Sequence, residues 1–155
     1  MMIQQAHDHR ESFRQSLSNG EAKTITDDFR LGMYEFSVRR LCDLDIMHSP
    51  ERILKQGKFV WVAEWKTGTS LSIFLHDPEL QHRLFERSMS SFESDGDLMH
   101  WVGQKVDDVE ITQSGVLAVA HRAGKPGAVS WFTNFKDRTK FLRTSQAFKF
   151  ANGIF

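Results

Sequence analysis

The stretch from Ile111 to Phe135 constrains the fold of this chain more than any other, and it reads ITQSGVLAVAHRAGKPGAVSWFTNF. Thr112 or Ser114 can cap a helix, because a hydroxyl at that point accepts a hydrogen bond from an otherwise unpaired backbone N–H. The residues that follow are small and apolar nearly all round, as in a helix that is buried on every side. We therefore expect a central helix over residues 113–123.

This central helix should end at a polar residue and a turn. His121 stands in its last turn, and Gly124-Lys125-Pro126-Gly127 predicts a tight turn that is followed at once by a second apolar surface. Such a helix end could form the floor of a cleft. The alternative is a histidine that only bonds a backbone carbonyl, and the spacing alone favours this simpler interpretation.

The composition indicates one folded domain over residues 1–155. A chain of 155 residues can bury a real core, and its 40% apolar and 12% aromatic content argues against disorder. Twenty basic and twenty acidic residues cancel, so the totals favour neither nucleic acid nor an anionic membrane as a partner. Cys42 is the only cysteine, which excludes an intrachain disulfide and the usual zinc-finger spacings.

Targeting signals are missing from the sequence as given. No stretch reaches the length of a membrane span, and the first residues lack the apolar run of a signal peptide. We expect synthesis in the cytoplasm, with any delivery to the periplasm or cell wall by a route that needs no signal peptide.

Apolar residues spaced three and four apart predict further helices near 5–18, 33–46 and 78–94. The last has the clearest start, because Asp77 suits the N-cap and Pro78 the first helical position.

Two segments between these helices are ambiguous. Residues 59–65 alternate in the manner of a short strand, although an aromatic-rich irregular loop fits nearly as well. Residues 100–111 fit a short hairpin or an extended arm. The sequence shows no internal repeat and no domain linker.

The remaining candidates for chemistry are carboxylates at helix ends. Glu21 follows the first predicted helix, and Glu35 lies just past Gly32. A carboxyl group at the wall of a cleft suits acid-catalysed glycoside cleavage, because the leaving oxygen must be protonated. The alternative for either glutamate is a solvated surface charge.

Several short motifs share one order with a known family. They are GMYEF at 32–36, FLHDPELQ at 74–81, WVG at 101–103, ITQSGVLA at 111–118, and Ala120-His121 followed by Gly124 and Gly127. Together they resemble the lysozyme-like domain of phage lysins and bacterial peptidoglycan hydrolases, the group of soluble lytic transglycosylases and goose-type lysozymes. The resemblance runs from about residue 11 to the end of the chain.

The resemblance implies a mainly α fold: a lysozyme-like single domain with a minor β or extended arm. It implies cleavage of the glycan strand of peptidoglycan, by hydrolysis or lytic transglycosylation, with Glu21 as the general acid. Tyr34, Glu35, His121 and Gly124 would line the substrate site. No metal and no cofactor are expected.

The chain departs from the family pattern near the expected cleft. Ala22-Lys23 stands where the family has Ser-Gly or Ser-Ser, and Glu35 replaces a glutamine. A specialised or degenerate enzyme would show such changes. One alternative is therefore an inactive module that binds glycan or a protein partner in a phage or secretion assembly, which the neutral charge favours. A third is a regulatory or immunity protein of unrelated fold.

Overall fold

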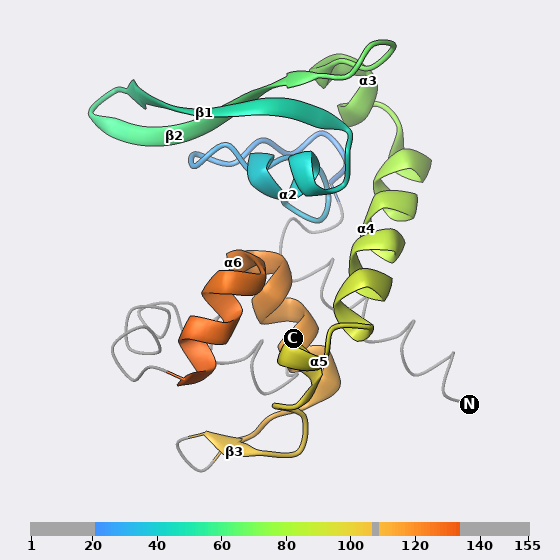
Figure 1. Ribbon diagram of the computed structural model, residues 1–155. Coiled ribbons are helices and arrows are strands. Elements are labelled where there is room, and N and C mark those ends of the chain that lie inside the picture. Colours follow the sequence, from blue (N-terminus) through green and yellow to red (C-terminus); the bar gives the residue numbers. More distant parts are fainter. Residues whose placement is uncertain (1–20, 107–108, 134–155) are drawn as a thin grey trace. The chain divides into compact units, whose positions relative to one another are not determined.

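The computed structural model describes residues 21–106 and 109–133, which divide between two compact units (Figure 1). The first unit contains the described residues up to Arg87, and the second contains those from Ser88 onward. In the described part of the chain, every helix is too short or too polar to cross a membrane. The helix predicted at 5–18 lies outside the described residues.

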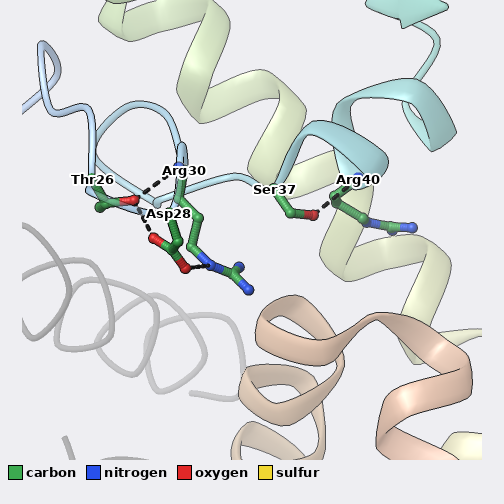
Figure 2. A network of polar contacts seen from close by, with 5 residues as sticks. All are labelled: Thr26, Asp28, Arg30, Ser37 and Arg40. Atoms are coloured by element: carbon green, nitrogen blue, oxygen red, sulfur yellow. Dashed lines mark hydrogen bonds and ion pairs between the residues drawn. The ribbon is translucent and has the colours of Figure 1, made fainter. Parts of the chain in front are cut away.

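The first unit begins with a loop that doubles back on itself before a short helix. Leu31 and Phe36 pair as an isolated antiparallel bridge, with both N–H···O distances at 2.9 Å, so residues 32–35 form a tight turn. Helix α2 (Val38–Asp43) follows, and its N-cap Ser37 accepts the N–H of Arg40 at 3.1 Å (Figure 2). The helix predicted at 33–46 is therefore wrong over its first residues and several residues too long.

A long antiparallel hairpin comes next, made of β1 (Met47–Lys55) and β2 (Lys58–Trp65). The two residues between the strands, Gln56 and Gly57, both have positive φ angles of 52° and 77°. Such a pair matches the type I′ turn, whose twist suits the right-handed twist of a hairpin. The strand predicted within 59–65 is confirmed, and the irregular-loop alternative is wrong.

Strand β1 was absent from the sequence prediction because it carries Pro50 and three charged residues. Proline enters a sheet only at an edge or an irregularity, since it has no N–H to donate. Here the pairing shifts register between His48 and Glu51, and Ser49 has a φ of 54°. The bulge takes the proline out of the hydrogen-bonded ladder.

The hairpin corrects the predicted fold class. A mainly α chain with a minor β arm was expected, whereas the observed architecture is mixed α/β. The β1–β2 hairpin spans residues 47–65, which were expected to be partly loop. Aromatic and β-branched residues alternate along β2 and favour a strand there, and β1 is the strand that pairs with it.

The first unit closes with α3 (Leu71–Leu75) and the start of α4 (Pro78–Glu93). Asp77 caps α4 as predicted, since its Oδ1 accepts the N–H of Leu80 at 3.0 Å. The predicted helix at 78–94 is thus confirmed to within one residue. The core side chains that are fully buried in this unit are Leu31, Phe36, Leu41, Phe74 and Phe85.

The second unit contains the end of α4, then α5 (Gly96–Met99), the short hairpin β3 (Lys105–Val106) and β4 (Val109–Glu110), and α6 (Gln113–Thr133). The β3–β4 pairing confirms the hairpin expected within 100–111.

Helix α6 confirms the helix predicted at 113–123. Its first half is buried, with every residue from Gly115 to His121 under 9% exposed. Gly124 interrupts it with φ 75° and ψ 167°, but the chain then returns to helix as far as Thr133. The predicted tight turn through Gly127 is therefore wrong. Pro126 is tolerated because it stands in the first turn of the second helical half, where no N–H is needed.

Candidate functional site

One buried amide organises the part of the first unit that contains the predicted acid. The side chain of Gln81, on α4, is fully buried. Its Oε1 accepts the N–H of Met33 at 2.8 Å, and its Nε2 donates to the carbonyls of Ala22 at 2.9 Å and Phe74 at 2.8 Å. We call these four residues the Gln81 junction. Burial of an amide is stable only when its polar atoms are paired in this way.

The junction requires glycine at position 32. A Cβ built on Gly32 would lie 2.5 Å from Oε1 of Gln81 and 3.1 Å from a ring carbon of Phe74. The φ of Gly32 is +81°, a conformation that side chains other than glycine rarely adopt. The GMYEF turn therefore approaches α4 closely because its first residue has no side chain.

Glu21 lies at the start of the described chain, with an exposed side chain. Its carbonyl accepts the N–H of Thr24 at 3.2 Å and the Thr24 hydroxyl at 2.7 Å. The carbonyl of Thr24 in turn accepts the N–H of Gly32 at 2.8 Å. The backbone of Glu21 is thus connected to the 32–35 turn both through Thr24 and, at the next residue, through Ala22 and Gln81.

Polar contacts fix the rest of the loop between Glu21 and the turn. The Thr26 hydroxyl donates to Asp28 at 2.5 Å and accepts the N–H of Arg30 at 2.8 Å, while Nε of Arg30 lies 3.1 Å from the other Asp28 oxygen (Figure 2). The Asp28 side chain is largely exposed, so this ion pair adds little stability by itself. Together with the backbone hydrogen bonds of this loop, the ion pair restricts the loop to one conformation.

Tyr34 is an internal residue of the site. It is 5% exposed, and its ring is stacked on Phe85 with centroids 3.9 Å apart and planes 5° apart. Its hydroxyl lies 2.7 Å from Nδ1 of His82. The hydroxyl of Tyr34 is thus already engaged, and the residue is part of the core of the first unit with little free surface for a ligand.

Glu35 has an unusual backbone for its type. Its φ is 49°, in the left-handed region, and it is 9% exposed. A residue with a Cβ is destabilised by about 1 kcal/mol in this conformation, whereas glycine is not. Four other non-glycine residues of the described chain, Phe29, Asp45, Ser49 and Gln56, also have positive φ, so the 32–35 turn accounts for this conformation without a functional role.

The other two predicted residues belong to the second unit. His121 is 2% exposed on α6, and Gly124 marks the interruption of that helix. The structure thus brings together the Glu21 loop, Tyr34 and Glu35 within the first unit. That His121 and Gly124 share a cleft with them stays a prediction.

An ion pair holds the segment that follows Gly124. Nζ of Lys125 lies 2.8 Å from Asp95 and 3.3 Å from Asp97, at the start of α5. The hydrogen bond from Lys125 holds the pKa of Asp95 below its usual range, and the same bond raises the pKa of Lys125. The start of the second half of α6 is thereby tied to the start of α5.

Sequence reasoning missed the two residues that assemble this site, Gln81 and His82. A signal was present for Gln81, since it stands within the apolar stripe of α4 beside Leu84 and Phe85. A glutamine at such a position must bond backbone groups. The role of His82 has no signal in the sequence, because its hydrogen-bond partner Tyr34 is 48 residues away and lies in a segment that the pattern predicts as helix.

Within the described ranges, no three side chains of His, Cys, Asp or Glu are grouped closely enough to hold a metal ion.

The sequence matches no protein family model, and no curated protein or solved structure shows significant similarity to it. The resemblance to lysozyme-like domains therefore rests on the motifs of the sequence.

Proposed function

We propose that this chain binds and cleaves the glycan strand of peptidoglycan, with Glu21 as the general acid. The observation that carries the proposal is the Gln81 junction. It connects the GMYEF turn and the FLHDPELQ segment, two of the motifs that carry the family resemblance, with the backbone of Ala22 next to Glu21. These bonds place two of the motifs beside the backbone of the loop that carries Glu21, as the proposed site requires.

The roles follow from the chemistry of glycoside cleavage. The leaving oxygen of the sugar needs a proton, and Glu21 lies on an exposed loop that a polymer can reach. Glu35, on the turn that Thr24 connects to that loop, is the residue that we propose as a second carboxylate of the substrate site. Where no second carboxylate takes part, the acetamido group of the sugar can assist, as in some glycosidases.

A second candidate is favoured by the exposure of the Glu21 side chain. A general acid usually sits in a sheltered, apolar environment that keeps it protonated near neutral pH. With an exposed carboxylate, the same loop would serve a catalytically inactive module that binds glycan or a protein partner of a phage or secretion assembly.

Clearance of a suspension of purified sacculi by the full chain tests the proposal. We expect wild-type protein to lower the turbidity, and Glu21→Gln to reduce the rate by about a hundredfold or more, the usual contribution of a general acid. Asp27→Asn is the matched control, because Asp27 is an exposed carboxylate of the same loop. Mass spectrometry of the products separates hydrolysis, which leaves a reducing end, from lytic transglycosylation, which leaves an anhydro sugar.

Two outcomes would decide against this assignment. Lysis that survives Glu21→Gln would exclude Glu21 as the acid. Absence of lysis together with co-sedimentation of the chain with sacculi would favour the inactive binding module. Circular dichroism of each variant checks that the fold is unchanged.

A further inference from the structure

The tip of the β1–β2 hairpin concentrates exposed apolar and basic side chains. Leu54 and Phe59 are 64% and 65% exposed, the highest values among the large apolar residues that the structure describes. They are direct cross-strand partners, so their side chains lie on the same face of the hairpin. An adjacent pair of this kind forms one small apolar patch.

Cations bracket this patch on both sides along the hairpin. Towards the turn, the exposed Lys55 and Lys58 form the next cross-strand pair, which alternation places on the opposite face of the tip. Towards the base, the guanidinium of Arg52 lies over the Phe59 ring, 4.7 Å from its centroid. Residues 52–61 contain no acidic residue, so this segment has a charge of +3 in a chain whose total is zero. The hairpin tip is therefore locally positive, although the chain as a whole is neutral.

The covered and uncovered parts of the hairpin differ clearly. Nearer the base, the ring of Trp61 lies on the same face and is covered by Arg39, whose guanidinium is 4.7 Å from the centroid. Arg39 belongs to α2, and the tip extends past that helix (Figure 1). The patch of Leu54 and Phe59 is thus the part of this face that α2 leaves exposed.

We infer that the hairpin tip docks on the surface of an anionic lipid bilayer. Apolar side chains that enter the boundary between headgroups and acyl chains, with lysine and arginine at headgroup level, are the usual pattern of interfacial binding. The positive charge complements the negative surface potential of such a membrane. This is surface contact without a span, and it does not depend on the proposed glycan cleavage.

Single-stranded nucleic acid is the main competitor for a basic, aromatic surface, and the details disfavour it. Base recognition by such surfaces relies on free aromatic faces. One face of Phe59 is already occupied by Arg52, and its neighbour Leu54 is aliphatic and offers no stacking surface. The aliphatic Leu54 suits insertion into an apolar layer, and the guanidinium of Arg52 can stay at the level of the headgroups.

Co-sedimentation of the full chain with lipid vesicles tests the inference. We expect binding to phosphatidylcholine vesicles that contain about one-third phosphatidylglycerol, much weaker binding to pure phosphatidylcholine, and loss of binding as added salt screens the charges. The double variant Lys55→Gln/Lys58→Gln should weaken binding about 25-fold, since each cation contributes about fivefold. The double variant Leu54→Ser/Phe59→Ser should reduce it to background.

Matched controls lie elsewhere in the same unit. Ile73→Ser removes an apolar side chain that is 49% exposed on α3, and Lys23→Gln removes an exposed cation from the Glu21 loop. Both should bind vesicles like wild type. The inference is overturned if wild type fails to bind anionic vesicles, or if either tip variant binds as tightly as wild type. Tight binding of a single-stranded oligonucleotide with no vesicle binding would also overturn it.

Discussion

The side-chain carbonyl of Gln81 accepts a hydrogen bond from the backbone N–H of Met33 over 2.8 Å, and the two residues are 48 positions apart in the sequence. The same amide bonds two carbonyls through its nitrogen. A single side chain therefore satisfies three backbone groups from three segments, and the loop that carries Glu21 depends on it.

We expect Gln81→Leu to lower the free energy of unfolding by about 3 kcal/mol, because leucine preserves much of the volume but removes three hydrogen bonds to the backbone, two of them buried. Urea denaturation followed by circular dichroism measures the loss. Gln113→Leu, at an exposed position of α6, serves as the control and should change stability little. A loss no larger than that of the control would show that the junction adds nothing to stability.

Gly32→Ala should also destabilise the chain by about 3 kcal/mol. Part of this cost is the left-handed backbone, about 1 kcal/mol, and the rest is the displacement of Gln81 by the new methyl group. Gly57→Ala isolates the first part, since Gly57 has a similar φ of 77° and a Cβ at that position would have no atom within 4 Å. Equal losses in the two variants would argue against a close contact at Gly32.

Tyr34→Phe should cost about 1 kcal/mol, because the hydroxyl loses its bond to His82. Tyr34→Ala should cost about 3–5 kcal/mol through loss of the ring that stacks on Phe85. His82→Ala completes a double-mutant cycle with Tyr34→Phe. A coupling energy of about 1 kcal/mol would establish the contact, and strictly additive losses would contradict it.

The pair of Lys125 and Asp95 should make stability depend on pH at acid values. The bond from Lys125 lowers the pKa of Asp95 in the folded chain. Asp95 therefore contributes stability above its unfolded pKa, and this contribution is lost as the pH falls through the lower folded pKa. A carboxyl titration by NMR should show the pKa of Asp95 rising towards its ordinary range in Lys125→Met. Lys105→Met is an exposed control that should leave the titration unchanged.

Sequence patterns predicted the elements whose signals are local. Helix α4 has its cap at Asp77 and a regular apolar stripe, and the first half of α6 is apolar all round, so both were found. Strand β2 was found because its aromatic and β-branched residues alternate.

The missed features depend on contacts between distant segments. The apolar pattern predicts a helix face that includes Met33, Tyr34 and Phe36. In the structure, the N–H of Met33 donates to Gln81, and residues 32–35 form a turn in place of the first helical turn. Strand β1 lacks the sequence pattern of a strand and forms because it pairs with β2. Because β1 was not predicted, a mixed α/β fold was predicted as mainly α. Of the candidate site, Glu21, Tyr34 and Glu35 were named from sequence, but the amide that positions their loops was not.

The fit between Gly32 and Gln81 has a consequence for the divergence of this protein over time. A side chain at position 32 would occupy the space that the Gln81 amide now fills. Replacement of the glycine would therefore displace the Gln81 amide or favour a shorter residue at position 81, and either change would weaken the bonds to the three backbone groups. The two positions should covary among homologues, and loss of either residue should mark lineages in which the Glu21 loop has taken another conformation.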